Sequence, residues 1–193
     1  MDFRKLPDSA AWQHQQARAG FEVVFLQIEE GVIRCAGCTT AVEEGEAWFV
    51  EYEIELDAAW RTRRAHVRGR AGNVMRATAL TTDGYGHWQV DGKPAPWLHG
   101  CVDVDLESSA FTNALPVHRL TFGVGGTVEA PAAYVRALSL DTERLEQQYT
   151  RVDDIGEQMC FDYVAPSFDF ACRLIYDEYG LVVDYPGIAL RIR

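Results

Sequence analysis

The sequence has no long apolar run. No segment approaches the roughly 20 consecutive apolar residues that a membrane-spanning helix requires, so we expect no integral membrane association. Residues 1–16 contain charged residues and several glutamines without an apolar stretch, which is unlike a secretory signal. These two absences lead us to expect a cytoplasmic protein.

Basic residues are also scarce. The chain has 18 Lys and Arg residues against 29 Asp and Glu residues, and a formal net charge of −11. Such a surface repels the phosphates of nucleic acids, so we expect no nucleic-acid partner. The densest basic stretch is Arg61, Arg63, Arg64, Arg68 and Arg70.

This basic stretch follows an acidic one that contains Glu51, Glu53 and Glu55. If the two stretches form a hairpin, opposite charges face each other across the strands. A ladder of this kind mainly promotes solubility. The alternative is that one arginine turns inward and grips a phosphate or carboxylate through two hydrogen bonds.

Few motifs for metal or cofactor chemistry occur. The five cysteines are scattered, and we expect them to be reduced. Cys35 and Cys38 have the spacing of half a zinc site, but no second ligand pair follows. The strand-like residues after Cys38 do not suit a redox motif. We therefore expect two ordinary cysteines around a turn, with no metal and no cofactor.

Motifs for phosphate binding and nucleophilic catalysis are equally few. The run Gly123–Gly126 lacks the Lys and Ser or Thr of a phosphate-binding loop, and we interpret it as a hairpin turn. A Gly-x-Ser-x-Gly motif does not occur. The five histidines show no metal-ligand spacing.

Apolar residues alternate with polar ones along much of the chain. Residues 48–56, 102–107 and 168–177 follow this period of two, which is typical of half-buried strands. Short Asp-Gly, Glu-Gly and Gly-Gly turns separate such runs and favour antiparallel neighbours. Only residues 9–19 and 141–149 are candidates for short helices, and neither has a helical apolar stripe. We predict an all-β fold of antiparallel meanders with few or no helices.

The chain contains a weak internal sequence similarity. A strand, an Asp-x-Tyr-Gly turn and a second strand occur around residues 83–86 and again around residues 177–180. This similarity has two interpretations: hairpins that resemble one another by chance, or two pseudo-repeats at about residues 20–122 and 127–193. We expect residues 1–193 to form a single domain. In the second interpretation, this domain is a roll or partly open barrel with a cavity between its sheets.

Asp103 and Asp105 are the best-placed pair of carboxylates. The two residues are separated by one position on a predicted strand, which places their Cα atoms about 6.6 Å apart. That is near the spacing of inverting glycosidases, but two neighbours on one strand point the same way and cannot flank a bond from opposite sides. A solvated strand face is the simpler interpretation, and a cavity wall that binds ligand hydroxyls is the alternative.

Several short runs, in order, carry a resemblance to a known family. They are Glu51-Tyr52, Leu56-Asp57, Trp60-Arg61-Thr62-Arg63, Asp83-Gly84-Tyr85-Gly86, Trp88, Gly100-Cys101-Val102-Asp103-Val104-Asp105-Leu106, Thr112-Asn113, Leu115-Pro116, Arg119-Leu120, Tyr149-Thr150-Arg151, Tyr179-Gly180 and Asp184-Tyr185-Pro186-Gly187. From about Gly20 onward, the chain resembles the bacterial family named for glycolipid binding. The resemblance implies curved antiparallel sheets with pseudo-repeats, similar in outline to periplasmic lipoprotein carriers. It also implies a role in glycolipid metabolism.

Our leading hypothesis is a lipid or glycolipid carrier or sensor with an apolar cavity between curved sheets. The candidate ligand-binding residues are Trp60, Arg61, Arg63, Trp88, Asp105, Asn113, Arg119, Tyr149 and Arg151. One alternative is a hydrolase or isomerase acting on a glycolipid-like substrate, with Asp103 or Asp105 as acid or base. Another is a non-catalytic protein-interaction module, which predicts an exposed apolar patch or sheet edge.

Overall fold

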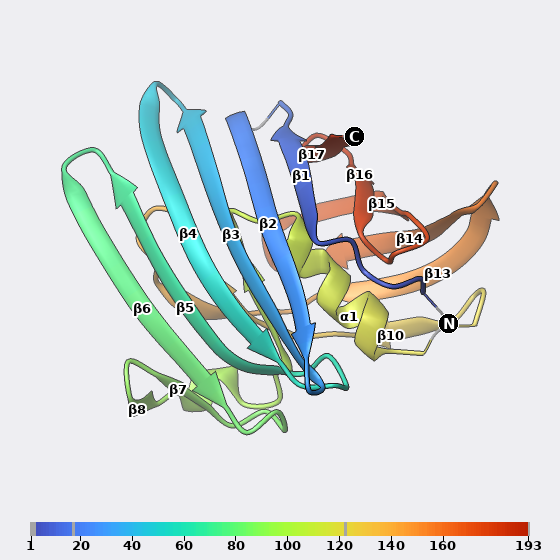
Figure 1. The fold of residues 1–193 in the computed structure, drawn as a ribbon, viewed down its shortest axis with the longest axis horizontal. Helices are drawn as coiled ribbons and strands as arrows, with labels where there is room; N and C mark the ends of the chain where they lie inside the picture. Colours follow the sequence, from blue (N-terminus) through green and yellow to red (C-terminus); the bar gives the residue numbers. More distant parts are fainter. Residues whose placement is uncertain (1–2, 17, 122, 193) are drawn as a thin grey trace.

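A large curved antiparallel sheet dominates the structure, a computed structural model that describes residues 3–16, 18–121 and 123–192. The sheet has 14 strands in the order β10-β13-β14-β15-β16-β17-β1-β2-β3-β4-β5-β6-β7-β8. It curves without closing into a barrel (Figure 1). The predicted all-β fold of antiparallel meanders is confirmed.

The strands of the large sheet form two meanders that meet at β1. The first group is β1 Ser9–His14, β2 Ala19–Glu29, β3 Val32–Glu43, β4 Glu46–Leu56, β5 Thr62–Ala71, β6 Val74–Thr82, β7 Trp88–Val90 and β8 Lys93–Pro94. The second is β10 Thr127–Glu129, β13 Gln148–Ile155, β14 Gln158–Ala165, β15 Phe170–Tyr176, β16 Val182–Tyr185 and β17 Ala189–Ile192. β1 pairs with β2 on one side and β17 on the other. That the meanders are sequence repeats stays a prediction.

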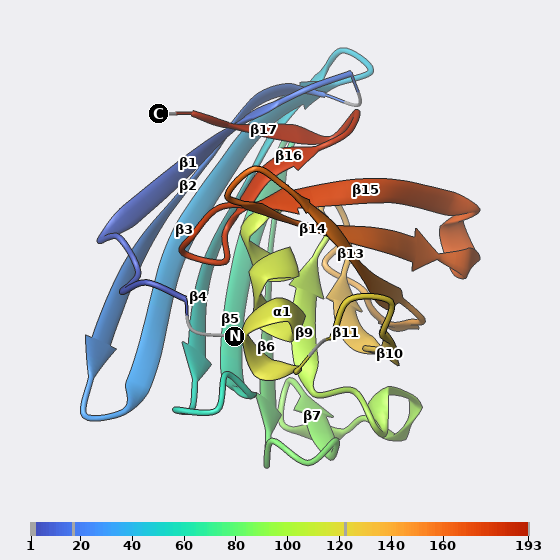
Figure 2. The ribbon, with the colours of Figure 1, turned by 90° about the vertical axis from the view of Figure 1, so that its right-hand side faces the viewer.

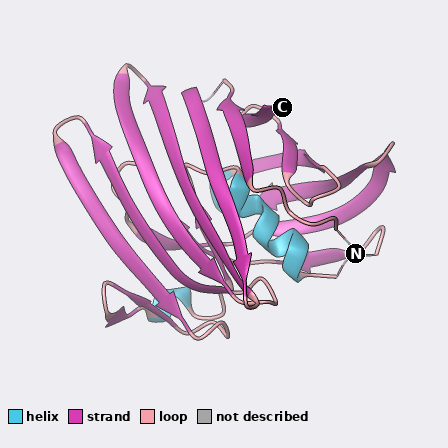
Figure 3. Ribbon diagram, viewed as in Figure 1, coloured by secondary structure: helices cyan, strands magenta, loops and turns pink. Residues whose placement is uncertain are grey.

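A smaller sheet and a short helix lie on one side of the large sheet. The smaller sheet has the order β12-β11-β9, with β9 Asp103–Leu106, β11 Ala132–Val135 and β12 Thr142–Leu145. The helix α1 Ala114–Arg119 follows the 3₁₀ turn η2 Phe111–Asn113; two more such turns are η1 Pro96–Leu98 and η3 Pro166–Phe168. Figure 2 shows α1 and β9 beside strands β1 to β6, and Figure 3 shows the helix against the strands of the large sheet. We call this side of those strands the inner face and the opposite side the outer face.

The alternation in the sequence explains which side of each strand is buried. On β4, Trp48, Val50, Tyr52, Ile54 and Leu56 are buried, whereas the glutamates between them are partly or fully exposed. The core lies between the inner face and the segments that cover it, and Leu98, Phe111 and Leu115 are fully buried there. Each such side chain contributes roughly 1.5–3 kcal/mol on burial. The main core is therefore built from the inner face together with η1, η2 and α1.

Two local expectations from the sequence are wrong. Cys35 and Cys38 do not flank a turn; they lie within the continuous strand β3, with Cys35 buried and Cys38 partly exposed. Asp103 and Asp105 do not lie on a solvated strand face, because β9 is covered on both sides and all four of its residues are buried. The helix occurs at residues 114–119, outside both candidate segments. None of the helices in the described residues is long and apolar enough to cross a membrane.

Candidate functional site

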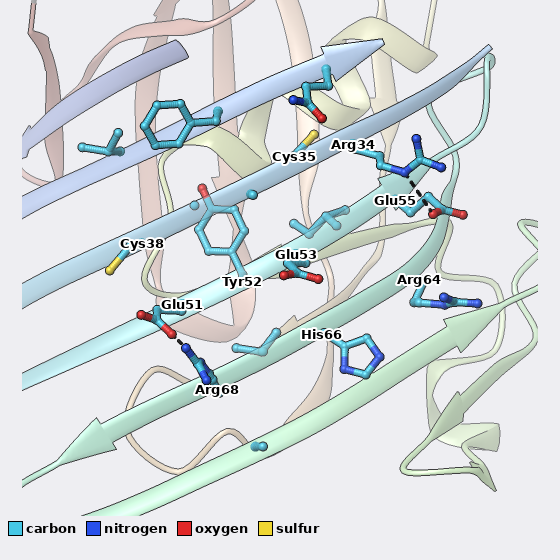
Figure 4. Close-up of a pocket in the computed structure, with 18 residues that line it drawn as sticks. Arg34, Cys35, Cys38, Glu51, Tyr52, Glu53, Glu55, Arg64, His66 and Arg68 are labelled. Carbon is cyan, nitrogen blue, oxygen red and sulfur yellow. Dashed lines mark hydrogen bonds and ion pairs between the residues drawn. The ribbon is translucent and has the colours of Figure 1, made fainter. Parts of the chain in front are cut away.

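The outer face of strands β2 to β6 is hollowed into a trough of about 970 Å³ (Figure 4). Apolar side chains of β2 and β3 form one wall, and charged side chains of β4 and β5 form the other. Ligand-binding clefts commonly have volumes of about 300–1,000 Å³ and a mainly apolar lining with a few polar groups. We call this hollow the outer trough.

The apolar wall continues a stripe of exposed side chains along β2. Phe21, Val23 and Phe25 alternate with buried residues and are 48%, 37% and 61% exposed. Val23 and Phe25 line the trough. Their cross-strand partners on β3 are Cys38 and Ala36, small residues that leave the aromatic ring uncovered. We call Phe21, Val23 and Phe25 the β2 stripe; such a grouping of exposed apolar residues is typical of binding surfaces.

The charged wall is a ladder of opposite charges across β4 and β5. The pairs in register are Glu51 with Arg68, Glu53 with His66 and Glu55 with Arg64. Arg68 donates a hydrogen bond to Glu51, and Arg34 on β3 lies 3.7 Å from Glu55. In Figure 4 these side chains stand on neighbouring strands around the trough. The predicted ladder therefore exists, with Arg64 in it; Arg61 and Arg63 lie elsewhere.

The floor of the trough rests on a buried polar network. The Tyr52 ring crosses β3 at Gly37, and its hydroxyl donates a 2.6 Å hydrogen bond to Glu22 on β2. Glu22 also accepts hydrogen bonds from the Ser109 hydroxyl and from the backbone N–H of Ala110, at 2.7 Å. Burial raises the pKa of Glu22, and the four donors around it lower that pKa only in part. The network joins the sheet to the segment that leads into α1.

Four of the nine predicted ligand-binding residues come together near α1, inside the protein. Asp105 accepts a 2.7 Å hydrogen bond from Thr112, and the Tyr149 hydroxyl donates a 3.1 Å bond to Asn113. Burial raises the pKa of Asp105 to about 6. The fourth residue, Arg119, binds Asp103 and is described next. Each of these polar groups has a partner within the chain.

Asp103 and Arg119 form a two-point ion pair. The Arg119 Nε and Nη2 atoms donate hydrogen bonds of 2.9 and 2.6 Å to the two carboxylate oxygens of Asp103. Asp103 is 1% exposed, so burial raises the pKa of its carboxyl and Arg119 opposes that shift. A buried ion pair of this geometry holds β9 against α1.

Three other predicted residues lie around the turns that end β4 and β6. Trp60 stacks on His118 with ring centroids 3.6 Å apart, and Arg61 lies over the Tyr85 ring at 4.9 Å. Arg63 donates to the Asp83 backbone carbonyl. Trp60 thus contacts α1 beside Arg119, whereas Arg61 and Arg63 contact the turn that follows β6.

The last two predicted residues are held by backbone carbonyls. The Trp88 indole N–H donates a 2.8 Å hydrogen bond to the Cys101 carbonyl, and Arg151 donates a 3.1 Å bond to the Cys160 carbonyl. Trp88 is part of the main core. Arg151, on β13, lies over the ring of Phe161 on β14. The nine residues thus lie in several places, and none of them lines the outer trough.

The residues of the outer trough were not among the predicted site residues. A signal for them exists in β2, where Phe21, Val23 and Phe25 alternate with Val24 and Leu26, so that both faces of the strand are apolar. A strand of a sheet with one solvated face normally has one apolar face. Among the described residues, no group of three or more His, Cys, Asp or Glu side chains is placed to hold a metal ion.

The comparisons with known proteins agree with the fold. Residues 9–191 match the family described as "Putative glycolipid-binding", so the chain belongs to this family. The chain is similar to the crystal structure of a DUF1089 family protein from Pseudomonas aeruginosa, at 29% identity and a TM-score of 0.74, over 98% of this chain and 95% of that one. No curated protein matches the chain.

A second solved structure shares only the fold. It is a β-barrel-like protein of the DUF1849 family from Brucella abortus, with a TM-score of 0.54 and 8% identity, over 98% of this chain and 96% of that one. In both structures the likeness extends over nearly the whole length of each chain.

Proposed function

We propose that the protein binds a glycolipid in the outer trough and acts as a carrier or sensor. The observation that carries the proposal is the arrangement of the trough, in which the exposed β2 stripe faces a ladder of charged groups across a hollow of about 970 Å³. An amphiphile fits such a lining because its chain covers the apolar wall while its polar part stays near water. Membership of the family supports the choice of a glycolipid.

The proposal places the ligand in the outer trough and not in the cavity that we expected between the sheets. On the inner face, Leu98, Phe111 and Leu115 belong to the main core, and all three are fully buried. An acyl chain that entered there would have to displace well-packed side chains, each with a cost of several kcal/mol. On the outer face the apolar side chains are already exposed.

The size of the apolar wall sets the scale of affinity. From Phe21 to Phe25 the stripe extends about 13 Å along the strand. Each methylene removed from water contributes about 0.8 kcal/mol, so eight methylenes contribute about 6 kcal/mol at full burial. The open trough buries only one side of the chain, and association itself costs about 4 kcal/mol or more. Short-chain glycosides should therefore bind weakly, and longer chains more tightly.

The experiment uses n-octyl β-D-glucoside below its micelle-forming concentration, with binding measured by calorimetry. We expect Phe25→Ser to weaken binding about tenfold, since it removes the largest exposed apolar surface of the stripe. Ile155→Ser is the matched control, because Ile155 on β13 is also more than half exposed but lies outside the trough. Equal affinity in the wild type and Phe25→Ser, or no binding to the wild type, would overturn the proposal.

Native mass spectrometry of the gently purified protein provides an independent test. A copurified lipid or glycolipid that Phe25→Ser loses and Ile155→Ser retains supports binding in the trough. The same copurified mass in all three proteins places the lipid elsewhere and overturns the assignment of the site.

A further inference from the structure

A second hollow lies at the end of the β2 stripe. It has a volume of about 520 Å³ and is lined by residues 13–16 and 18–21, at the end of β1 and the start of β2, and by residues 42–44, at the turn from β3 to β4. The lining residues that matter here are Gln13, His14, Arg18, Phe21 and Glu43. We call it the rim hollow.

Buried nitrogen atoms without hydrogen-bond partners gather at the rim hollow. The Arg18 side chain is 9% exposed; its Nη1 donates a 3.4 Å hydrogen bond to the Glu107 carbonyl, but its Nε has no hydrogen-bond partner among the described residues. His14 is 6% exposed, and neither ring nitrogen makes a hydrogen bond of good geometry within that same part of the chain, although the backbone of Ile188 lies near the ring. Trp48 does not line the hollow, but it lies under the Arg18 guanidinium at 5.1 Å, and its indole N–H also has no hydrogen-bond partner by the same criterion. Buried polar atoms are normally satisfied, so this concentration indicates a polar ligand.

The charge around the rim hollow indicates a neutral ligand. Arg18 supplies one positive charge, and Glu43 lies 3.9 Å from its Nε. Glu44 also lines the hollow and adds a second negative charge. His14 is uncharged at neutral pH, because burial and the nearby Arg18 lower its pKa to about 4. An anionic group would meet a net negative surrounding, whereas sugar hydroxyls can donate to the glutamates and accept from the nitrogen donors.

The rim hollow and the outer trough share one strand. Phe21 lines the rim hollow, and Val23 and Phe25, on the same face of β2, line the trough. The distance from Phe21 to Phe25 is about 13 Å along the strand. A single amphiphile can therefore lie along the stripe with its headgroup at the rim. Phe21, nearly half exposed, offers a ring face to that headgroup.

We infer that the rim hollow is the headgroup subsite of the glycolipid and takes an uncharged sugar through Arg18, His14 and Glu43. This inference rests on the proposed function. It assigns the acyl chain to Val23 and Phe25 of the β2 stripe and the sugar to the rim hollow beside Phe21, and it excludes a phosphorylated or carboxylated headgroup at the rim.

The test compares three ligands with the same chain, namely n-octyl β-D-glucoside, n-octyl phosphate and 1-octanol. The Arg18 Nε–H resonance is followed by NMR, and affinities are measured for Arg18→Lys, which keeps the charge but removes the Nε donor. We expect the glucoside to shift this resonance and 1-octanol to leave it in place. Arg18→Lys should weaken glucoside binding about tenfold, the cost of one lost hydrogen bond to a charged donor, without changing 1-octanol binding.

Arg173→Lys is the matched control, since Arg173 is an exposed arginine paired with Asp162 on the other meander. An unshifted Arg18 resonance, an unchanged glucoside affinity in Arg18→Lys, or tighter binding of octyl phosphate than of the glucoside would overturn the headgroup assignment. If 1-octanol still binds and Phe25→Ser weakens it, the proposed function stands without the subsite. If no ligand binds, both fail. The NMR readout uses the wild-type protein and so does not depend on the folding of a variant.

Discussion

Tyr52 on β4 reaches over β3 to donate a hydrogen bond to Glu22 on β2, two strands away. The ring can cross because the residue that it passes on β3 is Gly37, which has no side chain. A Cβ atom at position 37 would lie 2.2 Å from the Tyr52 ring. One glycine thus determines how a buried carboxylate is satisfied, and with it how the sheet is joined to the segment before α1.

We predict that Gly37→Ala destabilises the protein. The added methyl group must push the Tyr52 ring away from Glu22, and overpacking of this kind costs about 1–3 kcal/mol. Urea unfolding monitored by circular dichroism measures the change. Gly123→Ala is the control, because a Cβ there meets no atom within 4 Å among the described residues. Equal unfolding midpoints for the two variants would contradict the prediction.

We predict that the stability of the protein depends strongly on the ion pair between Asp103 and Arg119. Arg119→Met leaves a buried carboxylate without its cation, and we expect a loss of about 3–5 kcal/mol. The double variant Asp103→Leu and Arg119→Met should recover much of this loss, because both charges are then absent. A double-mutant cycle from denaturant unfolding tests the coupling.

The exposed Arg173–Asp162 pair is the matched control for that cycle. Its two hydrogen bonds are similar in geometry, but both side chains are about half exposed, so we expect a coupling of about 0–1 kcal/mol. Similar coupling energies at the two sites would show that burial is not what makes Asp103 and Arg119 important.

The raised pKa of Asp105 predicts a pH dependence of stability. The pKa is about 6 in the folded protein against an ordinary 3.8, so between these values the folded state holds the proton more tightly than the unfolded state. The free energy of unfolding therefore falls as the pH rises through this window, by roughly 3 kcal/mol in total. Asp105→Asn keeps an acceptor for Thr112 and does not titrate, so it should lack this decline.

Urea unfolding of the wild type and Asp105→Asn at pH 4, 5, 6 and 7 provides the measurement. The stability difference should move in favour of the variant as the pH rises. For Glu157→Gln, a change at an exposed carboxyl, the curve of unfolding free energy against pH should run parallel to that of the wild type. If the Asp105→Asn curve is also parallel, Asp105 does not hold its proton in the way that its burial implies.

Ligand binding should protect one cysteine from alkylation. Cys38 lines the outer trough and is partly exposed, whereas Cys172 on β15 is also partly exposed but lies outside the trough. Burial raises the pKa of both thiols, that of Cys172 to about 12, so labelling requires alkaline conditions. We expect octyl glucoside to slow the labelling of Cys38 and not of Cys172, as followed by mass spectrometry of peptides. Equal protection of both would contradict binding in the trough.

The strands were predictable because their signal is local. The alternation at residues 48–56 identifies β4 with its buried side, and the following turn and basic run identify β5. The signal failed where a strand is covered on both faces. Asp103 and Asp105 alternate with Val104 and Leu106 like a solvated strand, but β9 is buried on both sides and its carboxylates are paired with Arg119 and Thr112.

The candidate site was less predictable than the fold. The polar positions shared with the family were natural candidates, yet the hydrogen bonds of Asp105, Asn113 and Tyr149 are made within the chain. The outer trough depends on the register of several strands, which places Phe25 beside Ala36 and Glu51 beside Arg68. No single stretch of sequence contains that information, because register arises from pairing between strands.

The position of β1 has a consequence for biosynthesis. Its partner on one side, β2, follows at once, but its partner on the other side is β17, the last strand of the described chain. During translation the first meander can form early, while the free edge of β1 stays open until residues 189–192 leave the ribosome. An open edge in the middle of a sheet is a template for wrong pairing between chains. A stop codon before residue 189 should therefore yield aggregates rather than a slightly shorter soluble protein.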